Sequence, residues 1–171
     1  MNFDFFKKLV ILIIFVAISL FLKDLTFLSG SNNIFLNLKL PFSEGEKWIV
    51  TQGYYGSYSH NKGGNIYALD FSLPGEQDYG KPILAAADGI AYTKEQIKID
   101  FVTKERKYVG YGKYIDIDHG EYVTRYAHLL NFAVENGQEV RQGEVIGYAD
   151  NTGTSIGTHL HFALYKKEKR E

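Results

Sequence analysis

Near the end of the chain stands Gly157-Thr158-His159-Leu160-His161-Phe162-Ala163-Leu164-Tyr165. The apolar run after His161 and the small residues before His159 favour a β-strand in this stretch. Side chains two residues apart on a strand point to the same face of the sheet. We therefore expect His159 and His161 to stand side by side, so that one imidazole could bind a metal ion and the other could contact what the metal holds.

From about residue 40 onward the chain shows short strand-like runs and no helical stripe. Three of these runs, at 48–51, 65–72 and 114–118, are rich in β-branched and aromatic residues. Gly-containing turns separate such runs at regular intervals, and this spacing favours an antiparallel sandwich or an open barrel. The expected fold class is therefore mainly β, with antiparallel sheets, preceded by an N-terminal hydrophobic helix.

Two segments of the body carry more specific expectations. Asp88-Gly89 lies between the apolar runs 83–87 and 90–92, and this arrangement predicts a tight hairpin. The segment 97–111 is charged and loosely patterned, so we expect a long hairpin or a surface loop there.

The composition excludes several classes of function. The 171 residues carry 19 Lys and Arg against 20 Asp and Glu, a net charge of −1, so nothing indicates nucleic-acid binding. The chain has no Cys, which excludes disulfides, thiolate metal sites and a cysteine nucleophile. Any bound metal ion must therefore be held by imidazole and carboxylate groups.

The N-terminal sequence predicts export. Lys7 and Lys8 precede an apolar run from Leu9 to Leu22, which Lys23-Asp24 closes. A membrane-spanning helix needs about 20 apolar residues, so this shorter run fits the hydrophobic region of a signal peptide better. No A-x-A cleavage site follows the run, so an uncleaved membrane anchor, with the rest of the chain facing outward, stays open as the alternative.

Five histidines are available for metal chemistry: His60, His119, His128, His159 and His161. A catalytic zinc site takes three protein ligands and keeps a fourth position open for water. Zinc would lower the pKa of that water to make it a nucleophile, while an imidazole not bound to the metal removes the proton and later protonates a leaving amine. The inventory, with Asp70 as a carboxylate candidate, fits a zinc hydrolase, but spacing alone does not assign the roles.

Several motifs, in order along about residues 45–165, resemble those of the lysostaphin-type (LytM-like) zinc metalloendopeptidases, which cut peptide bonds in bacterial peptidoglycan. The matching stretches are Ser59-His60, Tyr67-Ala68-Leu69-Asp70-Phe71, Pro82 to Gly89, Tyr126-Ala127-His128-Leu129, Val134 to Gly147 and Thr152 to Phe162. Because these motifs are independent and follow the family's order, together they are far more specific than any one of them.

The resemblance implies a site and a substrate. It implies one zinc ion per chain, held by His60, Asp70 and His161, and it makes His128 and His159 the acid/base and transition-state pair. The implied substrate is a peptide of peptidoglycan, and the sequence leaves any protein partner open. A tyrosine ahead of the first histidine is expected to donate a hydrogen bond to the oxyanion, and three are candidates: Tyr54, Tyr55 and Tyr58.

The N-terminal pattern and the resemblance together divide the chain into three parts. Residues 1–29 are expected to be a signal peptide or membrane anchor, 30–44 a linker and 45–171 the zinc metallopeptidase domain. Domains of the family usually continue past the His-x-His strand, so this sequence is expected to be either a fragment or an unusually short member. Asp70 comes ten positions after His60, where the commonest family pattern has four, and the short spacing counted back from Asp70 falls on Ile66, which is not a histidine. Asp70 is nevertheless the best carboxylate candidate.

Two other functions compete with the hydrolase. A non-catalytic wall-binding or regulatory module on the same fold would be expected to lose ligands, whereas all the candidate ligands are present here. The Gly-rich unit 134–147 resembles lipoyl- and biotinyl-type carrier hairpins, but its turns at Asn136-Gly137 and Gln142-Gly143 offer no Lys. His119, in the Asp118-His119-Gly120 turn, is expected to have a structural or surface role.

Overall fold

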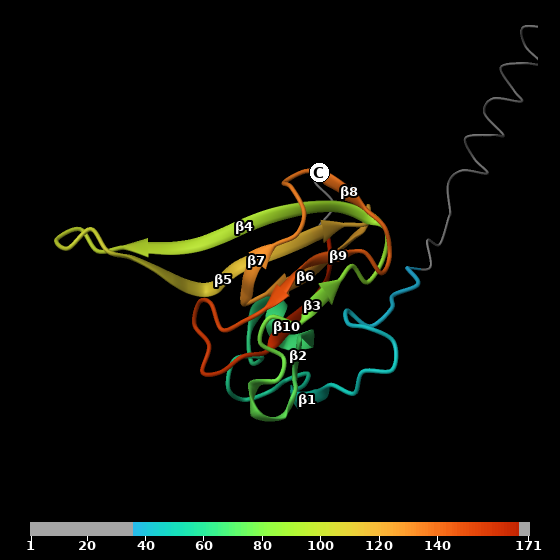
Figure 1. Ribbon diagram of the computed structural model, residues 1–171, viewed down its shortest axis with the longest axis horizontal. Coiled ribbons are helices and arrows are strands. Elements are labelled where there is room, and N and C mark those ends of the chain that lie inside the picture. The colour runs from blue at the N-terminus through green and yellow to red at the C-terminus, as the bar shows by residue number, and fades with distance from the viewer. Residues whose placement is uncertain (1–35, 168–171) are drawn as a thin grey trace, which may run out of the picture. The chain divides into compact units, whose positions relative to one another are not determined.

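The computed structural model describes residues 36–167, and in this part of the chain ten strands form two antiparallel sheets (Figure 1). The strands are β1 (Ile49–Gln52), β2 (Leu69–Ser72), β3 (Pro82–Leu84), β4 (Gly89–Ile99), β5 (Arg106–Asp118), β6 (Tyr122–Ala127), β7 (Leu129–Phe132), β8 (Gln138–Val140), β9 (Val145–Ala149) and β10 (Leu160–Lys166). One sheet has the order β1-β2-β10-β6-β5-β4-β8, and the other has the order β3-β9-β7. The expected mainly β, antiparallel fold class is confirmed.

Helical structure in the described residues is limited to two short 3₁₀ turns, η2 (Gly63–Tyr67) and η3 (Pro74–Glu76). Within residues 36–167 we find no helix with the length and apolar composition needed to cross a membrane. The expected hydrophobic helix, and the signal peptide or anchor at 1–29, lie outside the described residues. The first part of the expected strand 65–72 is η2, and only its second part is a strand.

The hydrophobic core draws buried side chains from both sheets. The larger sheet contributes Ile115, Ile117, Tyr126 and Leu160, and the smaller sheet contributes Ile83, Leu129 and Ile146. Phe42, in the segment expected to end the linker, is also buried, and its ring stacks on Trp48 with the centroids 5.1 Å apart. This part of the expected linker therefore lies against the sheets.

The hairpin expected around Asp88-Gly89 does not form. Strand β3 pairs with β9 in the smaller sheet, whereas β4 pairs with β5 and β8 in the larger one. Between them the chain crosses from one sheet to the other through Ala85–Ala87, all of which are buried. The Ala85 N–H bonds to the Glu144 carbonyl and the Asp88 carboxylate accepts from the Gln142 N–H, so burial and long-range pairing override the local turn signal.

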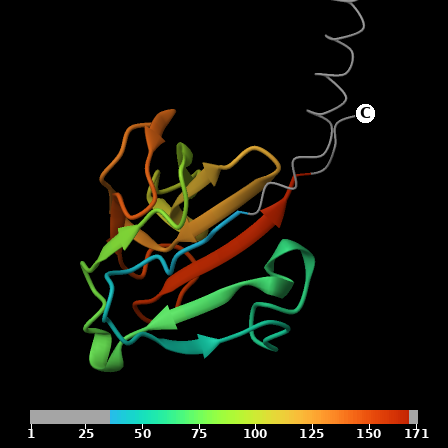
Figure 2. The ribbon, with the colours of Figure 1, turned by 90° about the vertical axis from the view of Figure 1, so that its right-hand side faces the viewer.

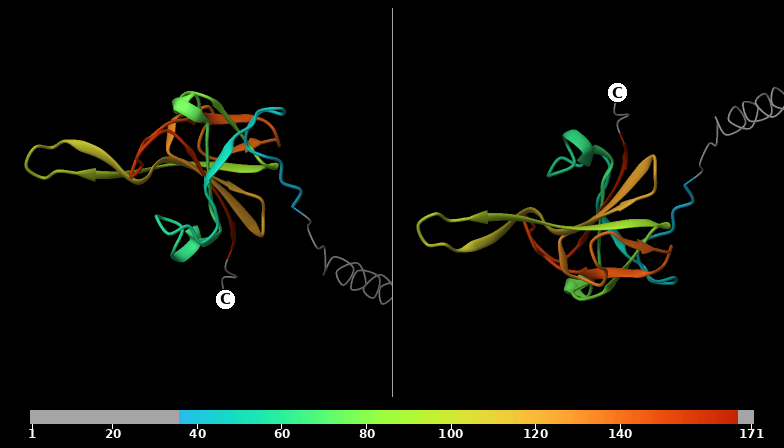
Figure 3. Two further views of the ribbon diagram at one scale, coloured as in Figure 1. Left: turned by 90° about the horizontal axis from the view of Figure 1, so that it is seen from below. Right: turned by 90° about the horizontal axis from the view of Figure 1, so that it is seen from above.

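The charged segment 97–111 proves to be part of a long hairpin, one of the two outcomes expected. Strands β4 and β5 continue beyond the rest of the larger sheet, and the protruding end is visible from below and from above (Figure 3). A register shift between Glu95 and Ile97 marks where the protruding part begins. Near it, Gly110 and Gly112 have φ of 55° and 63°, which glycine adopts without strain.

A partly buried ion cluster joins β4, β5 and β6. Arg125 donates from Nε and Nη2 to the two Asp116 carboxylate oxygens at 2.7 and 2.8 Å, and Lys94 Nζ donates to Oδ2 at 2.8 Å. The guanidinium also lies 4.5–5.0 Å from the ring centroids of three tyrosines: Tyr111, Tyr114 and Tyr165. Burial alone would raise the pKa of Asp116, but the hydrogen bonds and charges of Arg125 and Lys94 outweigh it and lower the pKa.

We expect Asp116→Asn to destabilise the fold by about 3 kcal/mol at neutral pH, because Arg125, whose side chain is only 20% exposed, would lose its anionic partner. Because folding lowers the pKa of Asp116, the stabilisation is present above the unfolded value of about 3.9 and is lost as pH falls through the folded value. Thermal unfolding should be measured from pH 7 to pH 3. The difference in melting temperature between the unmodified protein and the Asp116→Asn variant should become smaller towards pH 3. The exposed carboxylate variant Glu139→Gln is the control, and a gap that stays constant with pH would contradict the prediction.

Candidate metal centre

Strand register places a carboxylate and an imidazole in one row. Asp70 in β2 lies directly opposite His161 in β10, and His161 lies opposite Ala127 in β6 on its other side. Figure 2 shows β10 running beside β2 in the larger sheet. His128 follows Ala127 in the connection to β7. Because Ala127 lies opposite His161, His128 also comes close to the Asp70–His161 pair.

His60 comes from the loop between β1 and β2. Its backbone N–H bonds to the Gly56 carbonyl at 3.0 Å, and the loop is closed by a bond from the Tyr55 N–H to the Ile66 carbonyl at 2.9 Å. The turn η2 occupies part of the ten-residue gap between His60 and Asp70. The additional residues thus form a closed loop that folds His60 back over β2.

The atoms of the three predicted ligands converge. His60 Nε2, His161 Nδ1 and Asp70 Oδ1 form a triangle with sides of 3.3, 3.2 and 2.9 Å, and all three side chains are buried. Zinc bonds of 2.0–2.1 Å in a tetrahedral site place ligand atoms about 3.3 Å apart. The triangle therefore has the dimensions of one face of a zinc site.

Hydrogen bonding around His60 supports a cation at the centre. The His60 Nδ1 contacts the Gly53 carbonyl at 3.0 Å, and since a carbonyl only accepts, Nδ1 carries the proton. The lone pair of Nε2 then faces the Asp70 Oδ1, another acceptor, at 3.2 Å. Two acceptors at this distance need a proton or a metal ion between them. Gln52 Nε2 donates to the second Asp70 oxygen at 2.8 Å and holds the carboxylate in place.

The charges at the centre are shaped by burial. Burial lowers the pKa of His161, although the Asp70 carboxylate opposes this effect, so the imidazole is held in the neutral form that binds metals. Burial would raise the pKa of Asp70, but the hydrogen bond from His161 and the electrostatic influence of the nearby His159 and His60 rings lower it overall. The donor set is two imidazoles and one carboxylate, a set that zinc favours.

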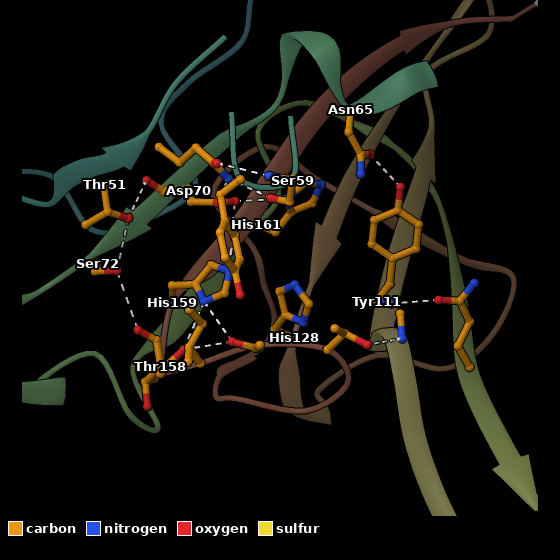
Figure 4. A pocket seen from close by; sticks show the side chains of 18 residues that line it. Thr51, Ser59, Asn65, Asp70, Ser72, Tyr111, His128, Thr158, His159 and His161 are labelled. Atoms are coloured by element: carbon orange, nitrogen blue, oxygen red, sulfur yellow. Dashed lines mark hydrogen bonds and ion pairs between the residues drawn. The ribbon is translucent and has the colours of Figure 1, made fainter. Parts of the chain in front are cut away.

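His128 and His159 face the same pocket, which has a volume of about 630 Å³ and is lined by both rings and by Asp70 and His161 (Figure 4). The two ring centroids lie 4.6 Å apart. His128 Nδ1 bonds to the Thr152 carbonyl at 2.7 Å, and His159 Nδ1 to the Gly157 carbonyl at 2.9 Å. Both Nδ1 atoms therefore carry the proton, which leaves each Nε2 as an acceptor.

The backbone at His128 is fixed by close packing of loops. His128 has a φ of 63°, an unfavourable conformation for a residue with a side chain. Its ring partner Thr152 lies in a segment packed against Gly110 and Gly112: a Cβ atom at Gly112 would approach the Thr152 backbone to 2.5 Å, and one at Gly153 would approach the Gly110 carbonyl to 2.4 Å. Burial, aided by the nearby His159, lowers the pKa of His128 to about 3, so the ring is neutral at pH 7.

Of the three tyrosines considered for the oxyanion, Tyr58 alone is among the pocket-lining residues in the described chain. Tyr54 and Tyr55 instead pack edge-on against Tyr67, with ring centroids 5.8 and 5.6 Å from it. Tyr111, which the sequence did not single out, lines the pocket, and its ring centroid lies 5.5 Å from that of His161.

His119 takes no part in the pocket. Its ring nitrogens contact the Asp88 carbonyl at 2.6 Å and the Thr124 hydroxyl at 2.8 Å. These bonds tie the Asp118-His119-Gly120 turn to the crossing segment between β3 and β4, which is the structural role expected for this residue.

Comparison with known protein families matches residues 65–171 to the family described as Peptidase family M23. The chain belongs to peptidase family M23. The matched range includes four of the five predicted site residues, namely Asp70, His128, His159 and His161. The fifth residue, His60, lies just before the matched range. Membership confirms the lysostaphin-type resemblance and assigns the chain to a family of metallopeptidases.

The M23 chain is similar to parts of much longer curated proteins. It is 36% identical over 96 residues to the peptidoglycan DD-endopeptidase ShyA of Vibrio cholerae, a match that covers 56% of this chain and 19% of ShyA. It is 38% identical over 95 residues to the DD-carboxypeptidase/endopeptidase Mpg of Neisseria meningitidis, covering 55% of this chain and 18% of Mpg. The chain thus spans about a fifth of the length of these relatives.

Solved structures share the fold. A zinc-containing peptidase from Vibrio cholerae superposes with a TM-score of 0.55 and 26% identity, covering 77% of this chain and 37% of that one. Csd3 of Helicobacter pylori gives a TM-score of 0.52 and 25% identity, covering 77% and 30%. The sheets of the M23 chain therefore belong to an architecture already seen in a peptidase that contains zinc.

Proposed function

We propose that this chain is an exported zinc-dependent endopeptidase that hydrolyses peptide bonds in bacterial peptidoglycan. One observation carries the proposal: two imidazole nitrogens and a carboxylate oxygen meet within 3.3 Å of one another, beside two further imidazoles in an open pocket. The names of the relatives ShyA and Mpg support peptidoglycan as the substrate. The N-terminal lysines and apolar run support export, with the segment 1–29 as a cleaved signal peptide or a membrane anchor.

The donor set fits zinc as the metal. His60, Asp70 and His161 would hold the ion. When bound, zinc lowers the pKa of a water molecule in its open coordination position and polarises the carbonyl to be attacked. The absence of Cys in the chain leaves imidazole and carboxylate as the ligands, in agreement with this triad.

The remaining chemistry falls to His128 and His159. Each ring donates its Nδ1 proton to a main-chain carbonyl, so each Nε2 faces the pocket with a lone pair that can accept a proton. One of them accepts the proton of the attacking water, and the same pair returns a proton to the leaving amine. Tyr58, whose side chain lines the pocket, is the candidate donor to the oxyanion among the three tyrosines considered.

Metal analysis and a hydrolysis assay test this proposal together. We expect the purified protein to hold about one zinc ion per chain and to release new amino termini from intact peptidoglycan. Chelation should abolish the release, and added zinc should restore it. Zinc binding without release of amino termini would favour a wall-binding module, and absence of zinc would refute the proposed centre.

A further inference from the structure

The protruding part of the β4–β5 hairpin has no core of its own. We call residues 97–108, beyond the register shift, the hairpin arm. Strand β4 pairs with β8 only at Gly89–Ala91, so in the described chain the hairpin arm is paired only within itself. All of its residues are exposed or half-buried, and none belongs to the hydrophobic core. An unsupported two-stranded ribbon is marginally stable in water. Because the hairpin arm adds nothing to the core, its length indicates a function outside the fold itself.

The tip of the hairpin arm presents apolar side chains to solvent. Phe101 is 86% exposed and Val102 is 90% exposed, and Ile99 beside them is 48% exposed. Hydrogen bonds hold the turn that carries these side chains: the Asp100 carboxylate accepts from the Val102 and Thr103 N–H groups, both at 2.8 Å. The tip is thus a preformed apolar projection on an ordered turn.

The strands behind the tip are basic. Lys98 lies directly opposite Lys107, and Arg106 lies opposite Ile99. Like charges facing each other across a strand pair are destabilising, and an anionic surface would remove that cost. Lys104 adds a fourth cation, whereas the anions of the hairpin arm are Asp100, whose carboxylate caps the turn, and Glu105. The hairpin arm therefore has a net charge of +2 behind an apolar end.

We propose that the hairpin arm inserts its Phe101-Val102 tip into the interface of an anionic lipid membrane. Apolar side chains buried at the acyl boundary, with lysine and arginine at the headgroups, are the combination by which peripheral proteins bind anionic bilayers. A soluble polyanion would satisfy the cations but would leave the apolar tip in water. A purely apolar protein pocket would bury the tip but would leave the facing Lys98 and Lys107 uncompensated.

The proposal gives the domain a fixed orientation, and it rests on the export that forms part of the proposed function. Gln96, Gly110 and Tyr111, at the base of the hairpin arm, line the pocket. The Tyr111 N–H bonds to the Gln96 side-chain oxygen at 2.6 Å, which ties the arm to the pocket wall. A tip held in the membrane would therefore set the height and direction of the pocket above the bilayer.

A single label tests the insertion on the full chain. Because the chain has no Cys, Val102→Cys can carry one polarity-sensitive fluorophore after reconstitution into vesicles. With phosphatidylglycerol present, we expect a blue shift and protection from an aqueous quencher. With phosphatidylcholine alone we expect a much smaller response, and a label at the exposed Glu135→Cys should respond in neither case. A label at 102 that stays aqueous in anionic vesicles would overturn the proposal.

Charge and tip variants separate the two contributions. In the labelled protein, Phe101→Ser should reduce the inserted fraction about tenfold, because a large apolar side chain no longer enters the interface. The double reversal Lys98→Glu with Lys107→Glu should abolish the preference for anionic lipid, whereas the matched reversal Lys47→Glu with Arg141→Glu should not. An equal response of the label to soluble polyphosphate would show a polyanion site and overturn the membrane assignment. Unchanged zinc content and thermal unfolding confirm that the variants fold.

The two proposals fail in different ways. If the chain hydrolyses peptidoglycan while the label at 102 stays aqueous, the membrane contact is wrong and the enzyme stands. If the label inserts but no peptide bond is cut, the proposed hydrolase is wrong and the membrane contact stands.

Discussion

Replacing His161 by alanine is expected to remove the metal and the hydrolytic activity together. His161 Nδ1 lies 2.9 Å from Asp70 Oδ1 and 3.3 Å from His60 Nε2, so its loss leaves one imidazole and one carboxylate. Loss of a residue that only orients a ligand costs about 10–100-fold in metal affinity, and loss of a ligand itself should cost more. The zinc content measured after dialysis should therefore fall from about one ion per chain to nearly none.

Two controls make the result specific. His119→Gln alters a histidine that does not line the pocket, and this variant should keep its zinc and its activity. Asp70→Ala should reproduce the loss seen with His161→Ala, because the carboxylate touches both ligand imidazoles. A His161→Ala protein that keeps full zinc and full activity would remove the basis of the proposed centre.

Replacing His128 by alanine is expected to keep the zinc and to lower kcat by about 10²–10⁴-fold, the usual contribution of a general acid or base. His128 does not belong to the ligand triangle, and its Nδ1 is bound to the Thr152 carbonyl instead. The measurement is zinc content alongside steady-state hydrolysis of a peptidoglycan fragment. Loss of zinc in this variant would show that the roles of the histidines are assigned wrongly.

The companion variant His159→Ala tests the pair. The His159 Nε2 lies 3.9 Å from Asp70 Oδ1, and its ring centroid lies 4.6 Å from that of His128. If the two rings act as a unit, the double variant should lose little more activity than the more impaired single variant. Fully additive losses would indicate two independent roles.

Local sequence patterns predict those parts of the site that a single strand determines. The spacing of His159 and His161 puts both on one wall of the pocket, as the period of a strand requires. The apolar run around Asp70 predicts a buried strand carboxylate, and the register places it opposite His161. These relations depend on neighbours within a few residues, so they can be derived before the fold is known.

Other features depend on long-range contacts that no local pattern encodes. The turn signal at Asp88-Gly89 predicts a hairpin, but the buried alanines 85–87, through which the chain crosses from one sheet to the other, decide the outcome. Gln52, which holds Asp70, and Tyr111, which lies against His161, become visible only when distant strands meet. The glycines on both sides of Tyr111 were the one available sign of an unusual backbone there.

Three imidazoles of the pocket have their proton positions set by main-chain carbonyls, those of Gly53, Thr152 and Gly157. No amino-acid exchange at these carbonyl-bearing positions deletes the acceptor, since every residue type supplies the same oxygen. Saturation libraries at those three sites should therefore contain many variants with working tautomers, limited by chain conformation and, at position 152, by loss of the hydroxyl that donates to the Leu129 carbonyl and accepts from the Lys113 N–H. Loop exchange with a distant homologue, which moves the oxygen itself, is the route by which an engineer would disturb the protonation pattern.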